Sequence, residues 1–176
     1  MKYAIFHTAL GEFGIGWTEA GIRRVLLPGD AADRMAEKLG GEAGEPSACA
    51  ASTIRLIQSY ADGEAADFSD VPLDLSGVPE FHRQVYDLLV EVGPGETTTY
   101  GALAERLGNP AWARAVGQAL GANPLPLLIP CHRVLGARGA LGGFSAPGGA
   151  GSKRRMLMLE GARTGAAPAE QLAFGF

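Results

Sequence analysis

Cys131 lies in the stretch LLIPCHRV, directly before His132 and Arg133. Only a thiolate is a competent nucleophile, and a neighbouring base or cation can favour that charged form. Consecutive side chains on a strand point to opposite faces, so His132 can serve Cys131 only if the chain turns there or a water molecule bridges them. Pro130 favours such a break in regular structure. A free cysteine in an apolar stretch is more often a small buried hydrophobe, so a reactive and a structural cysteine are both open here.

Helices with clear start and stop signals surround this stretch. Residues 78–92 carry an apolar stripe of helical spacing, and Thr99 can cap a helix over residues 100–107. Asn109 can cap the next helix, with a proline at its first position. Two short helices joined by a tight Gly-Asn turn predict a helix-turn-helix. A last helix is expected at residues 152–160, after a glycine-rich loop.

The second helix of this motif is rich in small residues. Its expected faces are an apolar stripe of Trp112, Val116 and Leu120, a smooth ridge of Ala113, Gly117 and Gly121, and a polar pair of Arg114 and Gln118. Each glycine destabilises a helix by about 1 kcal/mol relative to alanine. That cost is easier to explain if something must approach the backbone closely. The alternative is close packing on another helix, which composition alone favours.

The first half of the chain predicts a different architecture. Residues 3–8, 12–18 and 21–27 are short β-prone runs separated by glycine-containing turns, which predicts an antiparallel meander. Helices are expected at residues 31–39 and 47–60, the second capped by Ser47, with a loop (GGEAGEP) between them. The stretch DVPLDLSG predicts an extended segment.

We place a domain boundary near Ser76, where this extended segment ends. The predicted fold class is α+β. Residues 1–76 form a small N-terminal α/β domain with an antiparallel sheet. Residues 77–164 form a mainly helical domain with a winged helix-turn-helix, and residues 165–176 form a flexible tail.

Composition and charge limit the function classes. The chain has 176 residues, 47% hydrophobic and 19% charged, as in an ordinary globular protein. Its start lacks the long apolar core of a signal peptide, and no apolar run is long enough to span a bilayer, so we expect a cytoplasmic protein with reduced thiols. The net charge of −4 argues against indiscriminate nucleic-acid binding. Residues 1–76 carry 6 Lys+Arg against 12 Asp+Glu and residues 77–176 carry 9 against 7, so a polyanion should meet the second half.

The segments around Cys131 resemble the O6-alkylguanine-DNA alkyltransferases, that is, the methylated-DNA–protein-cysteine methyltransferases. The resemblance runs from about Phe81 to Gly161. It includes TTTYGALAERLGNPAWARAVGQALGAN, NPLPLLIPCHRVLG and the LEG after the glycine-rich loop. PCHRV is the signature of the family, and RAVG and GANP stand at matching spacing. The N-terminal half matches only loosely.

The resemblance implies a catalytic role for five residues. Cys131 would take the alkyl group from O6 of guanine and keep it, because a thioether has no easy leaving group. His132 would deprotonate the thiol through a water molecule, and Glu160 would orient that histidine. Tyr100 would donate a proton to the departing guanine. Asn123 would hold the turn around the site.

The resemblance also implies double-stranded DNA containing O6-alkylguanine as the partner of a monomer, with no cofactor. In this family the helix-turn-helix lies in the minor groove, where a helix needs small residues, and the target base is flipped out of the stack. Arg114 would be inserted where the flipped nucleotide was. The other residues assigned by position are Ala113, Gly117 and Gln118 at the DNA, and Val134, Ser145 and Phe144 around the base.

The chain departs from the family pattern in several places. Phe144 stands where many relatives have tyrosine, and the glycine-rich loop that contains it is about two residues longer than in several relatives, with Ala146-Pro147 as the expected addition. Trp112 stands where small residues are frequent, and we expect it to pack in the core rather than to touch DNA. Some relatives carry a structural zinc, but the remaining candidate ligands, His7, His82 and Cys49, lack partners at ligand spacing, so no metal is expected.

The chain ends in QLAFGF, from Gln171 to Phe176, which resembles the short peptides that dock into bacterial sliding clamps. Such a tether would keep a repair protein near DNA. The alternatives are a frayed terminus and a tail folded back on the protein.

Three other classes share some of these features. An alkyltransferase-like protein would bind the lesion without repairing it, but such proteins lack the acceptor cysteine that Cys131 supplies. A helix-turn-helix transcription regulator of this kind uses a metal-binding N-terminal domain, for which no cysteine cluster is present. A cysteine hydrolase could use Cys131, His132 and Glu160, but it would turn over repeatedly and act without DNA.

Overall fold

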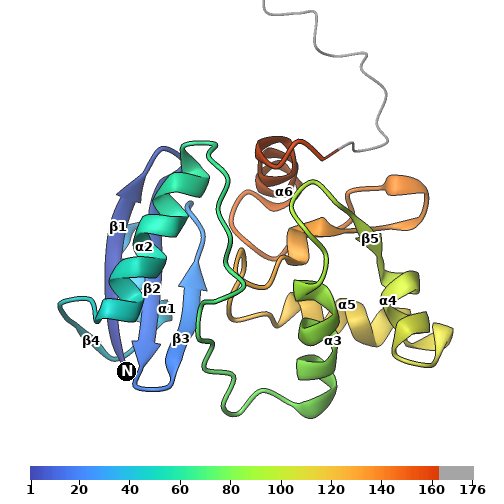
Figure 1. The fold of residues 1–176 in the computed structure, drawn as a ribbon, viewed down its shortest axis with the longest axis horizontal. Coiled ribbons are helices and arrows are strands. Elements are labelled where there is room, and N and C mark those ends of the chain that lie inside the picture. The colour runs from blue at the N-terminus through green and yellow to red at the C-terminus, as the bar shows by residue number, and fades with distance from the viewer. Residues whose placement is uncertain (163–176) are drawn as a thin grey trace, which may run out of the picture.

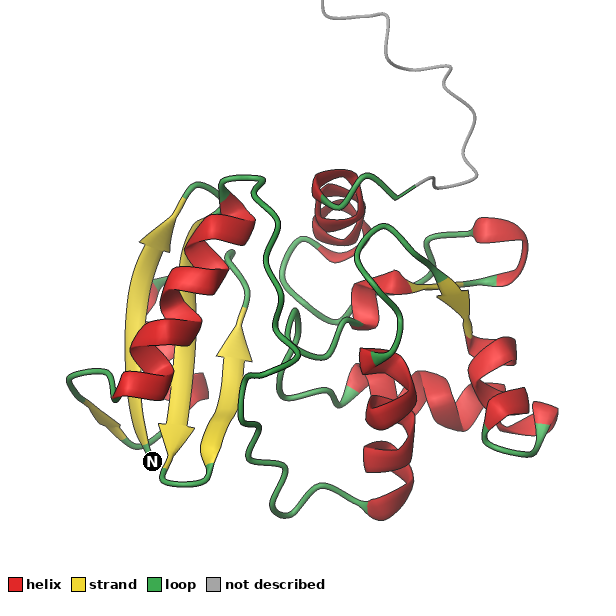
Figure 2. Cartoon of the chain, in the orientation of Figure 1, coloured by secondary structure: helices red, strands yellow, loops and turns green. Residues whose placement is uncertain are grey.

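The computed structural model describes residues 1–162 and has two halves that lie side by side (Figure 1). One half is a sheet with two helices, and the other is mainly helical (Figure 2). The elements of the first half are β1 (Lys2–Thr8), β2 (Gly11–Thr18), β3 (Gly21–Leu26), α1 (Ala32–Leu39), β4 (Glu42–Ala43) and α2 (Ala48–Ala61). The α+β class and the antiparallel meander are confirmed.

The sheet has the order β3-β2-β1-β4, and both β1 and β3 pair antiparallel with β2. The helices α1 and α2 lie on opposite sides of it (Figure 1). Strand β2 is buried on both faces, with Phe13 and Ile15 in the core. Between them, a Cβ atom on Gly14 would lie 2.9 Å from Leu39 Cδ1, so glycine at this position lets α1 pack closely on the strand.

The segment GGEAGEP, expected to be a loop, contains the short strand β4, so this expectation was wrong. Lys2 and Tyr3 of β1 pair in parallel with Glu42 and Ala43. The backbone N–H groups of Glu42 and Gly44 donate to carbonyls at the start of the chain. A two-residue strand is too short to show an alternating pattern, and it forms because β1 offers an unpaired edge.

The second half holds the elements that surround Cys131. They are α3 (Glu80–Val90), β5 (Thr98–Thr99), α4 (Tyr100–Arg106), η1 (Pro110–Trp112), α5 (Ala113–Gly121), η2 (Cys131–Arg133), β6 (Val134–Leu135), η3 (Ala137–Gly139) and α6 (Gly149–Leu159). The pair α4 and α5 forms the expected helix-turn-helix. Strands β5 and β6 form a separate parallel pair. The winged form of the motif stays a prediction.

Local capping signals in the sequence correspond to real helix starts. The Ser47 side chain accepts from the N–H of Ala50, and Thr99 accepts from Ala102. Asn109 also caps the following turn, but that turn is the 3₁₀ helix η1, and the α-helix begins only at Ala113.

Trp112 is 40% exposed, so the expectation that it packs in the core was wrong. Its ring meets Phe81 edge-on at 5.7 Å. Trp112 belongs to η1, whose tighter winding takes it out of the stripe that Val116 and Leu120 continue. Those two residues are buried as expected, together with Ala119.

The linker between the halves is extended, as predicted, and is attached to β3. Ile22 N–H donates to Pro72 O, and Asp74 N–H donates to Ile22 O, both at 2.8 Å. The Asp74 carboxylate accepts from Thr18 and Arg23. The linker therefore crosses the sheet edge at a fixed place before α3 begins.

Candidate active site

Cys131 opens the 3₁₀ turn η2, so the chain turns where the order cysteine–histidine–arginine requires it. The N–H of Cys131 donates to Ile129 O at 2.8 Å, and the N–H of Arg133 donates to Pro130 O at 2.9 Å. The thiol is only 8% exposed. The apolar residues that lead to it, Leu125, Leu127 and Ile129, are fully buried. They anchor the loop that presents Cys131.

Asn123 fixes this loop through both ends of its side-chain amide. Its Nδ2 donates to Ile129 O, and its Oδ1 accepts from Leu125 N–H, each at 2.9 Å. An amide that bridges two backbone groups of one loop restricts the path of the chain between them. The position assigned to Asn123 from sequence is therefore a loop-holding position in the structure.

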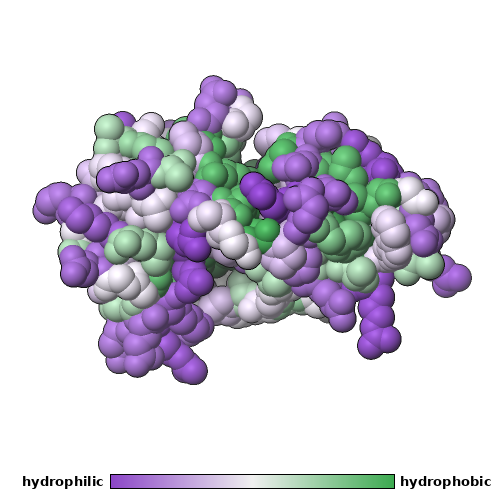
Figure 3. Space-filling model, turned by 90° about the horizontal axis from the view of Figure 1, so that it is seen from below, coloured by the Kyte–Doolittle hydropathy of each residue, from purple (hydrophilic) through white to green (hydrophobic). Residues whose placement is uncertain are grey.

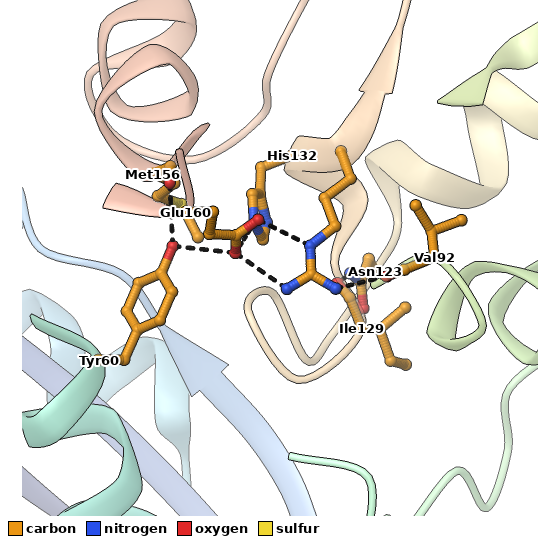
Figure 4. Close-up of polar contacts among 8 residues, drawn as sticks. Tyr60, Val92, Asn123, Ile129, His132, Met156 and Glu160 are labelled. Carbon is orange, nitrogen blue, oxygen red and sulfur yellow. Dashed lines mark hydrogen bonds and ion pairs between the residues drawn. The ribbon is translucent and has the colours of Figure 1, made fainter. Parts of the chain in front are cut away.

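Figure 4 shows the polar network around Glu160, which includes His132, the residue after Cys131. His132 Nε2 lies 2.7 Å from Glu160 Oε1, and both side chains are almost fully buried. The other ring nitrogen, Nδ1, is buried without a hydrogen-bond partner among residues 1–162. A neutral imidazole that donates from Nε2 to a carboxylate leaves Nδ1 as a proton acceptor. The ring is thus prepared to receive a proton at Nδ1.

Arg133 holds the same carboxylate from the other side. Its Nε donates to Glu160 Oε2 at 2.8 Å and its Nη2 donates to Oε1 at 2.9 Å. Its Nη1 donates to Val92 O, at the end of α3 (Figure 4). A bidentate pair of this kind is geometrically specific. Arg133 therefore has a structural hydrogen-bonding role, because it links Glu160 to the backbone that follows α3.

Burial and hydrogen bonding set the protonation states of Glu160, His132 and Cys131. Burial opposes the charged form of Glu160, yet hydrogen bonds from His132 and Arg133 hold the pKa of Glu160 down at about 2. Burial lowers the pKa of His132 despite its contact with that carboxylate. Burial raises the pKa of the Cys131 thiol, opposed by Asn123 and the charge of Lys153. The resting site therefore has a thiol, a neutral imidazole and a carboxylate.

Two further residues of the site escaped sequence reasoning. Lys153, on α6, is fully buried, and its Nζ donates to Val134 O at 2.6 Å. Tyr60, on α2 of the other half, has its hydroxyl 3.3 Å from Glu160 Oε1. A lysine on a polar helix is usually exposed. A tyrosine a hundred residues before its partner carries no local signal.

The residues assigned to the base and to the proton transfer do not all line one cavity with Cys131. Phe144 and Ser145 line a cavity of about 540 Å³ together with Cys131 and Asn123. Tyr100 and Val134 are not among its lining residues. Tyr100 begins α4 and is packed beside Gly117, where an added Cβ would lie 3.8 Å from its ring. Val134 is fully buried directly after the turn.

The loop extension Ala146-Pro147 forms part of the same cavity and touches the first half. Pro147 packs so tightly on Gly29 that a Cβ there would lie 2.4 Å from the Pro147 Cβ. Ser152 Oγ donates to Pro147 O at 2.6 Å and ties the extension to α6. Residues of β3 and Leu27, which follows it, also line the cavity. The cavity is therefore shared between the two halves.

The face of α5 next to Tyr100 is smooth and bordered by polar side chains. Ala113 and Gly117 are half-buried, whereas Arg114 and Gln118 are exposed. Seen from below, hydrophilic residues cover much of the outer flanks of the molecule, and apolar ones gather near the junction of the halves (Figure 3).

Two features are absent from the described residues: a group of metal ligands and a membrane-spanning helix. Within residues 1–162, no three His, Cys, Asp or Glu side chains are grouped to hold a metal ion. Over the same range, no helix is both long and apolar enough to cross a membrane. Both cysteines are free, with Cys49 half-buried.

The α+β fold places a buried cysteine beside a buried histidine–glutamate pair, in the half of the chain that holds the helices α4 and α5. A family model described as the DNA-binding domain of 6-O-methylguanine DNA methyltransferase matches residues 80–162. The chain is 36% identical over 162 residues to a methylated-DNA–protein-cysteine methyltransferase of Methanosarcina acetivorans, covering 92% of this chain and 99% of that protein. The chain belongs to the methylated-DNA–protein-cysteine methyltransferase family and is an enzyme.

Two further comparisons extend this likeness. The chain is 43% identical over 121 residues to the Mycobacterium tuberculosis protein of the same name, with 69% of each chain covered. Its structure resembles that of Mycobacterium tuberculosis OGT in complex with DNA, with a TM-score of 0.76 and 32% identity, over 91% of this chain and 92% of that one. The likeness therefore includes the N-terminal half, which sequence motifs matched only loosely.

Proposed function

We propose that this protein repairs DNA by transferring an alkyl group, mainly methyl, from O6 of guanine to Sγ of Cys131. The observation that carries the proposal is the array Cys131, His132 and Glu160, in which a buried imidazole leaves one nitrogen ready to accept a proton. A nucleophile, a base and an orienting carboxylate are the parts that covalent catalysis requires.

The transfer moves one alkyl group to Cys131 and, in net terms, one proton from the thiol to guanine. His132 takes the thiol proton through a bridging water molecule at Nδ1, and Glu160 balances the imidazolium charge. The thiolate attacks the alkyl carbon, the C–O6 bond breaks, Tyr100 donates a proton to the departing guanine, and the tyrosinate regains a proton from the His132 imidazolium through solvent. The resulting thioether is stable, so each molecule acts once. The same chemistry extends to O4 of thymine.

On the DNA side, we propose that α5 lies in the minor groove of a duplex and that the damaged nucleotide is flipped. Support comes from the smooth face of Ala113 and Gly117 and from the exposed side chains of Arg114 and Gln118. Arg114 fills the place of the flipped nucleotide, which partly offsets an unstacking cost of about a few kcal/mol. Val134, Ser145 and Phe144 surround the base.

Intact-mass spectrometry after incubation with O6-methylguanine duplex DNA tests the proposal. We expect one added methyl group per molecule, located on the Cys131 peptide, and none in Cys131→Ala. Repeated turnover without DNA would identify a hydrolase instead, and specific binding to an undamaged operator would identify a regulator. Fresh protein that gains no mass would refute the alkyl transfer.

We further propose that residues 1–76 and 77–164 are separate domains, which is supported by the extended linker between the sheet and α3. A monomer and a cytoplasmic location remain predictions. The sliding-clamp peptide from Gln171 to Phe176 lies outside the described residues. A pull-down with the clamp, comparing the full chain with one ending at Ala169, tests that tether.

A further inference from the structure

Tyr60 is the only residue of the sheet-bearing half whose side chain hydrogen-bonds Glu160 within residues 1–162. It lies at the end of α2 and is 5% exposed. Its hydroxyl is 3.3 Å from Glu160 Oε1 and 3.3 Å from Met156 O, both on or next to α6. Figure 4 shows the Tyr60 hydroxyl between Met156 and the carboxylate of Glu160.

The three contacts on Glu160 Oε1 compete for one oxygen. His132 Nε2, Arg133 Nη2 and the Tyr60 hydroxyl all approach it, at 2.7, 2.9 and 3.3 Å. Each donor that shares the oxygen reduces the negative charge available to the others. Tyr60 therefore acts on the same atom that attracts the proton of the histidine ring.

Tyr60 can only act as a donor in this place. Burial, followed by the charge of Glu160, raises the pKa of Tyr60 far above its usual range. The ring is held by its edge-on contact with Phe68, at 6.1 Å. The neutral, fixed phenol therefore shares its one proton between Glu160 Oε1 and Met156 O, and it contributes part of a hydrogen bond to the carboxylate.

We propose that Tyr60 is a positioning residue for alkyl transfer: its hydroxyl bonds Glu160 Oε1, limits the pull of the carboxylate on His132, and keeps that ring neutral and ready to accept a proton. This inference rests on the proposed function. It gives the N-terminal half a part in the chemistry beyond a scaffold.

Other charged groups near the network do not replace Tyr60. Arg133 from η2 and Lys153 from α6 both oppose protonation of His132. Glu64 and Asp67 of the linker line a cavity with Tyr60, Arg133 and Glu160. All of these groups stay in place when Tyr60 loses its hydroxyl. A change in the pH at which His132 is protonated can therefore be assigned to the loss of that hydroxyl.

Tyr60→Phe tests the proposal through the pH dependence of single-turnover transfer from O6-methylguanine duplex DNA. Without the phenol, Glu160 attracts the His132 proton more strongly, so His132 protonates at higher pH and the acid limb of the profile moves upward. On that limb the rate should fall roughly two- to tenfold, the effect of one hydrogen bond, while the alkaline plateau stays nearly unchanged.

Tyr86→Phe is the matched control, because Tyr86 also has a buried hydroxyl, which donates to Ala119 O at 2.8 Å. It should lower stability without moving the acid limb. If Tyr60→Phe lowers the plateau and leaves the limb in place, Tyr60 is merely structural and the inference is overturned.

Two further measurements separate the possible failures. NMR titration of the His132 ring should show protonation at higher pH in Tyr60→Phe, even if the protein transfers no alkyl group and the proposed function fails. Should Tyr60→Phe not fold, 3-fluorotyrosine at position 60 keeps the ring and strengthens the donor, so the limb should move to lower pH. An unmoved limb and an unmoved titration in these proteins would refute the role of Tyr60.

Discussion

The two halves of the molecule bury different kinds of side chain. The buried residues of the sheet-bearing half are almost all apolar; its buried polar residues are Thr8, Thr53 and, in the linker, Asp74, whose carboxylate accepts from Thr18 and Arg23. The other half buries His132, Arg133 and Lys153, with the Glu160 carboxylate beside them. Burying charged groups is costly unless they are paired and hydrogen-bonded. Burial in the first half therefore mainly stabilises the fold. In the second half, burial of charged groups costs stability and forms the proposed active site.

The halves also differ in the contacts that hold their elements together. Strand pairing and helix packing hold the sheet, so its order depends on neighbours in sequence. The site depends on the side chains of Tyr60 from α2 and of His132 and Arg133 from η2, which meet around the carboxylate of Glu160. Loss of one member then leaves the others unsatisfied. The comparison predicts that substitutions in the two halves have separable effects on stability and transfer.

Glu160→Gln should produce the largest effect. The substitution leaves Arg133 buried without its charged partner, so we expect a loss of about 3–5 kcal/mol in the free energy of unfolding. It also removes the group that balances the histidinium, so transfer should slow by roughly 10²–10⁴-fold. Denaturant unfolding and single-turnover kinetics measure the two. The exposed Glu105→Gln is the control, and equal effects in both variants would contradict the special role of Glu160.

Ile15→Ala should affect stability alone. Ile15 is fully buried in β2, so its truncation leaves a cavity and should cost about 2–5 kcal/mol. The transfer rate of the folded fraction should stay unchanged, because Ile15 is in the apolar half. Denaturant unfolding at a temperature where the variant is folded, followed by kinetics, tests this. A large fall in the rate would mean that the halves are not separable.

Local signals explain what the sequence predicted well. The strands and most helices follow from alternation, helical stripes and caps such as Ser47 and Thr99, all of which act over a few residues. The turn at Cys131 followed from its neighbours. The grouping of Cys131, His132, Glu160 and Asn123 came from the family resemblance rather than from physical derivation.

What the sequence did not predict depends on distant segments. The strand β4 needs the free edge of β1, and Trp112 is exposed because a 3₁₀ turn precedes α5. The burial of Lys153 and the contact between Tyr60 and Glu160 arise only when α6 is placed against the rest of the chain. Such contacts have no period or motif, so a single sequence contains no local record of them.

Acid should destabilise the network through Glu160. Its pKa of about 2 in the folded protein lies below its ordinary value of 4.5, so its stabilising contribution is present above pH 4.5 and is lost as the pH falls toward 2. His132, whose pKa is lowered by burial, adds a loss as the pH falls below 6.5. Denaturant unfolding across this range measures both.

Asp74 must be separated from Glu160 in that experiment. Hydrogen bonds from Ser76 and then from Thr18 hold the pKa of Asp74 well below its usual range, so Asp74 also loses its contribution in acid. In Asp74→Asn the loss of stability between pH 4.5 and 2 should persist because Glu160 remains. If that variant becomes insensitive to acid, the linker and not the active-site network sets the acid stability.

Trp112→Ala should have the smallest effect on stability. It tests whether Trp112, at the junction of η1 and α5, packs on α3 or contacts DNA. The exposed indole loses an edge-on contact with Phe81, worth about 0.5–1.5 kcal/mol, and little buried area. Phe81→Ala should cost a similar amount, and the double variant should cost less than the sum of the two. Additive losses would show that the rings do not stabilise each other.

The affinity of Trp112→Ala for O6-methylguanine duplex DNA should stay close to that of the unchanged protein, because the indole packs on α3. A large loss of affinity would place Trp112 with Arg114 at the DNA.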